Sequence, residues 1–370
     1  MKFSDIFEFQ NKSGIKAGEG LKQGRYFFYT SSDEQTKFLN EYLFEGDALI
    51  FGTGGNASVH FIDQKFAVST DCLVSQPKDK RKVYAKFYYY FLRGNMRILE
   101  RGFKGAGLKH ISKSYISAIE LPKVDFDRQK TVVEILNQAD ALRQKRKQSL
   151  QLLDDFLRAM FLDMFGDPRS GSKWKIIDFG EIIDVLTDYH ANGSYEILRE
   201  HVALKSTPDY ALMVRTTDLE NNNFTDAVKY ISKDAYEFLK KSKVYGGEII
   251  INKIGSAGNV YLMPYLNRPV SLGMNAFLLR FNKSANTIYI YHALTSDYGK
   301  MIIDAKVQGA VTKTIRKDAI RSLKIPLPPI ELQNKFASIV AQVEQTQRNM
   351  QISRAELNSQ FNALTQRYFG

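Results

Sequence analysis

The sequence contains one long segment twice. The stretch "IELPKVDFDRQKTVVEIL" at residues 119–136 returns in altered form as "IPLPPIELQNKFASIV" at residues 325–340. An offset of 204 residues places Gln333 on Gln129, and the match runs without a gap for about 60 positions to the last residue. A tandem duplication of this length predicts two similar structural units, each ending in the repeated segment.

Each copy of the repeat contains a long stretch that favours a helix. From Asp127 the chain continues for almost forty residues, until Gly166, without Pro or Gly. Apolar residues recur at alternating steps of three and four, which predicts a coiled-coil seam that Arg143 and Arg146 interrupt. The predicted seam residues are Val132, Leu136, Ala139, Leu150, Leu153, Leu157 and Met160 in the first copy, and Phe336, Val340, Val343, Met350, Leu357, Phe361 and Leu364 in the second.

Helices this long need a partner. A single long amphipathic helix commonly packs on its own domain, but duplication in register favours pairing of the two copies. Because the pairing would have pseudo-twofold symmetry, we expect the two helices to be antiparallel, each of roughly 38 residues and about 57 Å.

The segments between the helices have a different pattern. They are rich in short β-type runs such as "DALIF" and "EIIINKIG", separated by Gly, Asn and Ser. Each also holds one helical segment, "VYAKFYYYFLRGNMRILERG" or "IYIYHALTSDYGKMIIDAKV". We expect a small mixed or antiparallel sheet in each, with the aromatic cluster at 88–91 in the core rather than stacking on bases. The predicted fold class is α+β: two small α+β domains joined and separated by two long helices packed as an antiparallel coiled coil, in a pseudo-twofold tandem repeat.

The net charge limits the classes of partner that the chain can bind. The chain has 52 Lys and Arg against 40 Asp and Glu, a net charge of +12, which fits either a polyanionic partner or a generally basic surface. The single cysteine, Cys72, excludes an internal disulfide and is typical of a reducing compartment. The first residues do not have the pattern of a signal peptide, and no apolar run approaches ~18 residues, so we expect a cytoplasmic protein without membrane contact.

Several motifs together resemble one known family. These are "LPKVDFDRQ" and "LPPIELQ" before each long helix, "FGDP" after the first, and "GAGLKHI" and "GAVTKTI" ahead of each proline. With "FFYTSSDEQTKFLNEYLFEGDALIFGTGGNASVHF", "KFAVSTDCLV", "VRTTDLE" and "GGEIIINKIGSAGNVYLM", they resemble specificity subunits of type I restriction–modification systems over essentially the whole chain. Two departures are Lys123, where a second proline is common, and a chain start without an evident counterpart of the "DPRSGSKWKIIDFGEI" that follows Gly166.

The resemblance implies a DNA reader that is not an enzyme. Residues 1–118 and 167–322 would be two target recognition domains, each binding one half of a bipartite site in double-stranded DNA. Residues 119–166 and 323–370 would be conserved regions that carry the long helices. These helices would set the distance between the half-sites and dock two adenine methyltransferase (modification) subunits, with restriction subunits in the full complex.

The residues themselves indicate no catalytic site, cofactor or metal. In "FGTGG" Thr53 stands where a cofactor-binding FxGxG motif has glycine, and no phosphate-binding GxxxxGK[ST] occurs. Asp209 and Glu220 could suggest a metal nuclease, but Asn222 stands where such a site needs lysine. The five histidines lack metal-ligand spacing, and Cys72 fits a buried strand better than a nucleophile.

Candidate DNA-binding residues follow from chemistry. Base edges are read by Arg, Lys, Asn, Gln, Ser and Thr, whereas phosphates are bound by Lys, Arg and backbone N–H groups. The candidates in loops are Tyr29, Thr30, Ser31, Thr53, Asn56, Lys104 and Lys109 in the first segment, and Arg215, Thr216, Asn222, Lys243, Lys253, Ser256 and Lys313 in the second. Lys109 and Lys313 are favoured because they hold matching positions after a glycine. The basic run "RQKRKQ" at 143–148 is interpreted as a solvated or partner-facing helix face.

Three function classes remain open. The leading hypothesis is the DNA-binding specificity subunit. The alternative is a non-catalytic coiled-coil scaffold that joins two RNA- or protein-binding modules. An autonomous adenine methyltransferase is the third and would require this chain alone to bind a cofactor.

Overall fold

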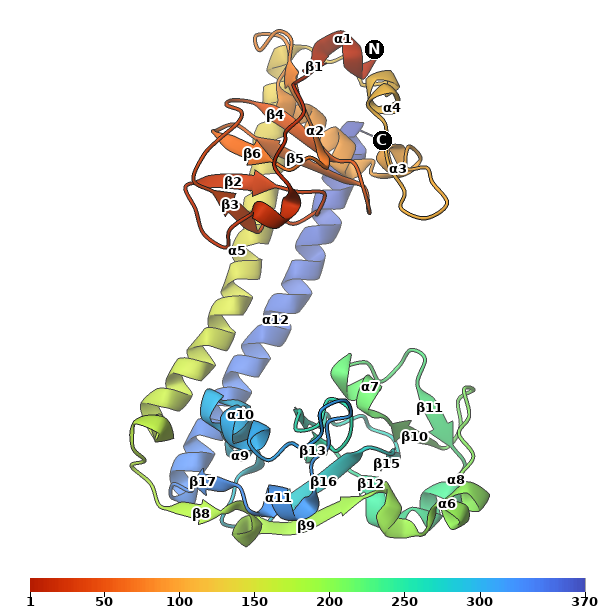
Figure 1. Cartoon of the computed structure of the whole chain (residues 1–370), viewed down its shortest axis with the longest axis vertical. Helices are drawn as coiled ribbons and strands as arrows, with labels where there is room; N and C mark the ends of the chain where they lie inside the picture. The colour runs from red at the N-terminus through yellow and green to blue at the C-terminus, as the bar shows by residue number, and fades with distance from the viewer. Residues whose placement is uncertain (370) are drawn as a thin grey trace. The chain divides into compact units, whose positions relative to one another are not determined.

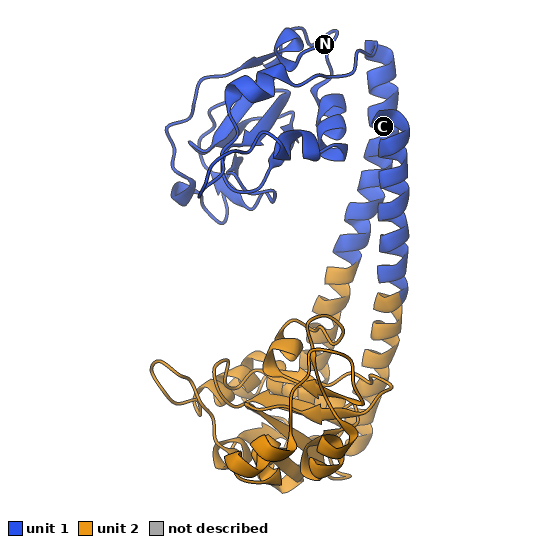
Figure 2. Ribbon diagram, turned by 90° about the vertical axis from the view of Figure 1, so that its right-hand side faces the viewer, with its two compact units in different colours: residues 1–149, 349–370 blue, residues 150–348 orange. Residues whose placement is uncertain are grey.

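The computed structural model describes residues 1–369, which form two compact units. Unit 1 comprises residues 1–149 and 349–370, and unit 2 comprises residues 150–348 (Figure 2). The division crosses both long helices, so each unit contains a piece of each helix together with its own α+β head.

The head of unit 1 contains two small sheets (Figure 1). The first is antiparallel, with the order β1 (Phe7–Phe9), β7 (Cys72–Pro77), β4 (Ala48–Gly52), β5 (Ser58–Ile62). The second has the order β3 (Lys37–Leu39), β2 (Tyr26–Tyr29), β6 (Phe66–Val68), and its β2–β6 pair is parallel. The helices are α1 (Phe3–Ile6), α2 (Ala85–Gly94), α3 (Arg97–Glu100) and α4 (Lys113–Ala118).

Unit 2 repeats this plan with additions. Its antiparallel sheet has the order β14 (Val260–Leu262), β13 (Ile249–Asn252), β16 (Ala276–Phe281), β9 (Ile183–Asp188). Its second sheet has the order β11 (Lys229–Ile231), β10 (Ala211–Val214), β15 (Val270–Leu272), β12 (Lys243–Val244), and β10–β15 is parallel. A two-stranded sheet joins β8 (Ile176–Asp178) to β17 (Lys324–Pro326). The helices of this head are α6 (Tyr195–His201), α7 (Thr216–Glu220), α8 (Lys233–Phe238), α9 (Thr287–Thr295), α10 (Asp297–Asp304) and α11 (Lys317–Arg321).

Every strand of the two sheets in unit 1 has a counterpart in unit 2, so the duplication includes the heads and not only the helices. The α+β class is confirmed, whereas the expectation of one small sheet per head is wrong because each head divides its strands between two sheets. The expected single helical segment in each head is also divided, into α2 and α3 or α9 and α10. Asn95 interrupts the first, and Ser296 both ends α9 and caps α10.

The chain start does have a counterpart in the second copy. The N–H of Phe3 donates to Ile119 O at 2.8 Å, as the N–H of Phe179 does to Leu323 O. Asp5 and Glu181 then accept a hydrogen bond from the backbone N–H three residues earlier. Residues 2–7 therefore correspond to residues 178–183, so the expectation that the chain start lacks a counterpart of "DPRSGSKWKIIDFGEI" is wrong for the end of that segment.

The long helices are α5 (Phe126–Phe165) and α12 (Ile330–Phe369), each of 40 residues. Asp125 accepts a hydrogen bond from the N–H of Arg128 at the start of α5, and Pro329 directly precedes α12. Gly166, at φ +78°, ends α5 in the left-handed conformation that glycine adopts most readily.

The two helices pack antiparallel, as their contacts in each unit show (Figure 1). In unit 1, Val132 and Leu136 near the start of α5 share a core with Phe361 near the end of α12. In unit 2, Phe161 near the end of α5 packs on Phe336 near the start of α12, with ring centroids 5.4 Å apart. An antiparallel coiled coil thus closes the core of each head.

The predicted seam residues lie at different depths. Val132, Leu136, Leu157, Phe336, Val340, Val343 and Phe361 are buried, whereas Ala139, Leu150, Leu153, Met160, Met350, Leu357 and Leu364 are half-buried. Polar contacts replace apolar ones toward the middle: Arg143 donates to Asn358 Oδ1 at 2.7 Å and Gln347 donates to Asp154 Oδ1 at 2.7 Å. Because the repeat relates Arg143 to Gln347 and Asp154 to Asn358, these two contacts occupy equivalent places.

A buried glutamine joins each head to its long helix. In unit 1, Gln129 accepts a hydrogen bond from the N–H of Tyr84 at 2.8 Å and donates to the carbonyls of Lys82 at 3.0 Å and Val124 at 2.8 Å. The side chain therefore ties the residues that precede α2 to those that precede α5. We call this set of three hydrogen bonds the glutamine clamp.

Unit 2 has an equivalent clamp. Gln333 accepts from the N–H of Asn286 at 2.8 Å and donates to the carbonyls of Ser284 at 3.1 Å and Pro328 at 2.8 Å. Gln129 is 1% exposed and Gln333 is 0% exposed, so water cannot replace a lost partner. The repeated glutamine is thus explained by a buried structural contact.

Replacing Gln333 tests the clamp. Gln333→Ala leaves buried backbone groups unpaired, so we expect the free energy of unfolding to fall by about 3 kcal/mol or more. Gln333→Glu keeps the size but turns a carboxylate oxygen toward two carbonyls, and should be at least as destabilising. Urea unfolding followed by fluorescence of the single tryptophan, Trp174 in unit 2, measures both variants.

Gln342→Ala, an exposed position on the same helix, is the matched control and should change the unfolding free energy by less than about 0.5 kcal/mol. Equal unfolding midpoints for Gln333→Ala and Gln342→Ala would contradict the clamp.

Candidate nucleic-acid interface

Three segments with predicted DNA-binding residues meet at one end of the unit 1 sheets. The N–H of Thr53, directly after β4, donates to Asp71 O at 2.8 Å, and its hydroxyl donates to the same oxygen at 2.9 Å. Ser31, just past β2, also donates its hydroxyl to Asp71 O at 2.9 Å. The turn that begins at Thr53 is thus fixed beside the end of β2.

A loop from Lys104 to His110 closes on this turn. Two backbone hydrogen bonds of 3.0 Å join Lys104 and His110, and the N–H of Ile111 donates to Thr53 O at 3.1 Å. A ring nitrogen of His110 lies 3.1 Å from the same carbonyl. We call residues 104–110 the tip loop of unit 1.

Unit 2 builds the same arrangement from different residues. The N–H of Lys253 donates to Asn275 O at 2.7 Å, and Lys253 O accepts from the N–H of Ile315 at 3.0 Å. Gln308 and Thr314 are joined by backbone hydrogen bonds of 2.8 and 2.7 Å and close the tip loop of unit 2, residues 308–314. Lys253 therefore occupies the position of Thr53. Ser256 comes three residues after Lys253, at the position that Asn56 holds in unit 1.

Five of the predicted residues project from these turns and loops into solvent. They are Asn56, Lys104, Lys109, Ser256 and Lys313. In the described part of the chain, the side chains of the three lysines have no ion-pair partner. Free ammonium groups beside closely approachable backbone suit contacts to phosphates.

Other predicted residues have partners already. Tyr29 is 7% exposed, and burial raises the pKa of its hydroxyl to about 12. Lys243 pairs with Glu237 at 2.7 Å and lies over the Tyr236 ring, on β12 and outside the set of turns. Tyr29 and Lys243 thus have structural contacts that account for their positions.

The end of β10 presents Arg215 and Thr216. The Arg215 guanidinium donates to both carboxylate oxygens of the buried Asp218 and to Ala227 O. Thr216 begins α7, and Asn222 lies exposed just past the end of that helix. In unit 1 the matching strand end carries Thr30 and Ser31, so the two units present different side chains at this place.

Sequence reasoning missed a buried carboxylate in unit 2. Asp188, at the end of β9, accepts hydrogen bonds from Lys253 at 3.0 Å and Lys317 at 2.9 Å. Burial alone would raise the pKa of Asp188, but these two lysines outweigh it and hold the pKa below its ordinary value. Asp188 thereby positions Lys253, and no local sequence signal connects the two because 65 residues separate them.

Asn252, directly before Lys253, was also missed. Its amide donates to Glu220 at 3.1 Å, whereas its Oδ1 is the one buried side-chain polar atom without a partner in residues 1–369. Unit 1 has Gly52 at this place, so the turn of unit 2 carries an additional polar side chain beneath it.

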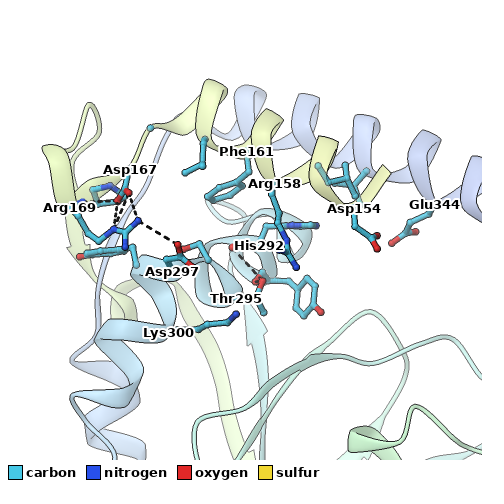
Figure 3. Close-up of a pocket in the computed structure, with 18 of the residues that line it drawn as sticks. Asp154, Arg158, Phe161, Asp167, Arg169, His292, Thr295, Asp297, Lys300 and Glu344 are labelled. Carbon is cyan, nitrogen blue, oxygen red and sulfur yellow. Dashed lines mark hydrogen bonds and ion pairs between the residues drawn. The ribbon is translucent and has the colours of Figure 1, made fainter. Parts of the chain in front are cut away.

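A second surface feature of unit 2 is a pocket of about 500 Å³ between α5, α9, α10 and α12 (Figure 3). Charged groups of both signs line it, including Asp154, Arg158 and Glu344. Arg169 bridges Asp167 and Asp297 at one end, at 2.6 and 3.6 Å. Burial lowers the pKa of His292 to about 4, so this imidazole is neutral at pH 7. A mixed-charge pocket of this kind suits a protein segment better than a polyanion.

Exposed apolar residues also occur along the long helices. They are Leu142 and Ile352 in unit 1, and Leu152, Phe156 and Leu162 in unit 2. Leu152 and Phe156 are four residues apart and therefore share one face of α5, which makes this face a candidate surface for a protein partner.

The described residues also bear on metal binding and membrane insertion. Among residues 1–369, no cluster of three or more His, Cys, Asp or Glu side chains is placed to hold a metal ion. None of the helices in that range is both long and apolar enough to span a bilayer.

Comparison with known proteins identifies the relatives of the chain. A family model described as the type I restriction modification DNA specificity domain matches residues 1–152 and 171–359. The type I restriction enzyme MjaVIII specificity subunit of Methanocaldococcus jannaschii is 21% identical over 324 residues, which cover 81% of this chain and 72% of the relative. The type I restriction enzyme EcoDI specificity subunit of Escherichia coli is also 21% identical, over 90% of this chain and 77% of the relative.

Two solved structures share the fold. The crystal structure of a type I restriction–modification S subunit from M. genitalium has a TM-score of 0.59 and 16% identity, covering 100% of this chain and 95% of that one. A structure from work on complex assembly and conformational transition of the type I R-M system has a TM-score of 0.55 and 15% identity, covering 100% and 96%.

The Asp188 contacts predict a pH-dependent contribution to stability. Asp188→Asn should lower the free energy of unfolding at pH 7 by about 1–3 kcal/mol, because two charge-assisted hydrogen bonds are weakened. Since folding lowers the pKa of Asp188, the wild-type advantage should be complete above about pH 5. It should disappear as the pH falls below the unfolded value of ~3.9 and through the folded pKa.

Urea unfolding at a series of pH values, followed by Trp174 fluorescence, measures this difference. Asp184→Asn, an exposed residue on the same strand, is the control. A wild-type advantage that grew toward acid pH would contradict the assignment.

Proposed function

The chain belongs to the family of type I restriction–modification DNA specificity subunits, and on this premise we propose that it reads a bipartite site in double-stranded DNA, one half-site with each head. The heads would be the target recognition domains 1–118 and 167–322, and residues 119–166 and 323–370 the conserved helical regions. As a specificity subunit the chain is non-catalytic. We place it in the cytoplasm, where its DNA substrate would be.

The observation that carries the proposal is the repeated surface of turns and tip loops. Each head builds this surface with the same hydrogen-bond pattern but presents different side chains on it. Lys109 and Lys313 hold equivalent places and are free to bind phosphates, whereas Thr53 and Lys253 differ at one position. A common backbone with different polar groups is what two readers of different half-sites require.

The same design would suit a scaffold that joins two RNA- or protein-binding modules. That alternative explains the coiled coil and the positive charge. Family membership favours DNA, and a head exchange distinguishes the two because only a DNA reader changes a methylated motif.

Head exchange is the direct test of the proposal. Residues 167–322 would be replaced by the equivalent head of another specificity subunit, and the chain expressed with a methyltransferase subunit. Sequencing of methylated adenines should show one half of the motif changed and the other half retained. Replacing residues 1–118 instead should change the other half. A change in both halves from either exchange would rule out one half-site per head.

We further propose that the long helices dock two methyltransferase subunits, with restriction subunits joining in the full complex. The exposed apolar residues on α5 and α12 and the pocket of unit 2 support a protein partner there. The duplication supports two copies, because each unit offers an α5–α12 surface of its own.

Native mass spectrometry of the co-expressed complex should therefore find two methyltransferase subunits per chain. Leu152→Glu, on the exposed side of α5, should weaken methyltransferase binding by about tenfold, because it places a charge where an apolar contact forms. Gln151→Glu, the exposed neighbouring residue, is the matched control and should bind normally. A fully active complex with one methyltransferase subunit would contradict this stoichiometry.

A further inference from the structure

The two most exposed large apolar side chains in the described residues lie in the two tip loops. Val311 is 98% exposed and Leu108 is 80% exposed. Single exposed apolar residues are common on proteins and need no explanation. Here, however, the two extremes occur in loops that the repeat relates to each other, although Leu108 and Val311 are one position apart within them. A shared loop function explains this coincidence better than chance does.

The backbone conformation of both tip loops is well defined. Gly105 and Gly309 adopt φ of +142° and +102°, and a Cβ at Gly105 would lie 2.7 Å from the carbonyl oxygen of Leu108. A Cβ at Gly309 would overlap the carbonyl oxygen of Thr312. Glycine is therefore required at the same place in both loops. With the paired backbone hydrogen bonds at the base, this geometry holds the apolar residue at the tip.

Each loop is also anchored from below. Ile111 is 4% exposed and directly follows the first loop, and Ile315 holds the same place after the second. Their N–H groups donate to Thr53 O and Lys253 O, so each tip loop rests on the turn that carries predicted DNA-binding residues. The apolar tip therefore faces solvent because of a supported backbone and not because the chain is loose there.

The charge of the tip loops indicates what they bind. Residues 103–111 include Lys104 and Lys109 and no acidic side chain, and residues 307–316 include Lys313 and Arg316 and no acidic side chain. The supporting turns 52–57 and 252–258 also contain no acidic side chain. An apolar group in a loop whose own charged side chains are all positive is complementary to a duplex, whose base planes are apolar and whose backbone carries phosphates.

We propose that Leu108 and Val311 are wedges that press against a base step in each half-site and partly unstack it, while Lys109 and Lys313 bind the flanking phosphates. This inference rests on the proposed DNA-reading function and adds a mode of recognition to it. The cost of parting a base step depends on its sequence, so a wedge contributes specificity at positions without hydrogen bonds. The bound DNA is kinked at both half-sites.

The experiment uses the full chain with its methyltransferase subunit and a duplex that carries the methylated motif. The fluorescent base 2-aminopurine replaces single bases of each half-site, except the methylated adenine, because its emission rises on unstacking. Binding of the wild-type complex should raise the 2-aminopurine emission at one base step in each half-site. Leu108→Ser should abolish the rise in one half-site only, and Val311→Ser in the other, with affinity reduced about tenfold or more. Leu108→Met and Val311→Ile, which keep an apolar tip, should restore both properties.

Salt dependence separates a wedge from a charge contact. The slope of log affinity against log salt should be unchanged in Leu108→Ser, whereas Lys109→Ala should reduce it by about one phosphate contact. Lys123→Ala, an exposed residue between α4 and α5 and outside the tip loop, should leave slope and affinity unchanged.

Two results would overturn the wedge. One is an emission rise that persists in Leu108→Ser and Val311→Ser while wild type binds the motif specifically; that outcome leaves the DNA-reading function intact. The other is unchanged DNA affinity with weaker methyltransferase binding in these variants, which would assign the tips to the protein partner. Failure of the wild-type complex to prefer the motif would instead contradict the proposed function itself.

Discussion

Both units depend on a glutamine that no water reaches. Gln129 and Gln333 each stand in the first turn of a long helix and hold the chain just before α2 and α9, respectively. An amide can do this because it supplies one acceptor and two donors in one plane, and a carboxylate or hydroxyl of similar size cannot. The clamp therefore fixes the start of α2 or α9 relative to the long helix that follows. It also allows the rest of the head to vary without moving that junction.

The two long helices were predictable because their sequence signals are local or repeated. The helices follow from heptad spacing and the absence of Pro and Gly, and antiparallel packing follows from the duplication. The sheets were not predictable in detail, since β2 and β6 pair in parallel across nearly forty residues and short strands carry little periodicity. Residues 2–7 escaped notice because a length difference within the heads shifts their counterpart away from the 204-residue offset.

The candidate site was predictable to a smaller degree. Lys109 and Lys313 could be chosen because the repeat gave them matching places after a glycine, and the structure leaves both exposed. Tyr29 was chosen by residue type, yet its ring packs inside the head against Phe66. Asp188 could not be found at all, because its contact with Lys253 exists only once β9 and β13 have joined the same sheet. Exposure and long-range pairing are properties of the folded chain.

The contrast between Thr53 and Lys253 shows how such a chain can change what it reads. The backbone of each residue makes the same two hydrogen bonds. Its N–H donates to the carbonyl of Asp71 or Asn275, and its carbonyl accepts from the isoleucine that follows the tip loop. Only the side chain differs, and the lysine is accompanied by Asp188, which holds its ammonium in place. At this position the heads thus differ by a lysine and by its carboxylate partner, which lies 65 residues away in the same head and not in the long helices. This separation between a fixed backbone and coupled surface residues lets the two heads differ while the helices and their partners stay the same.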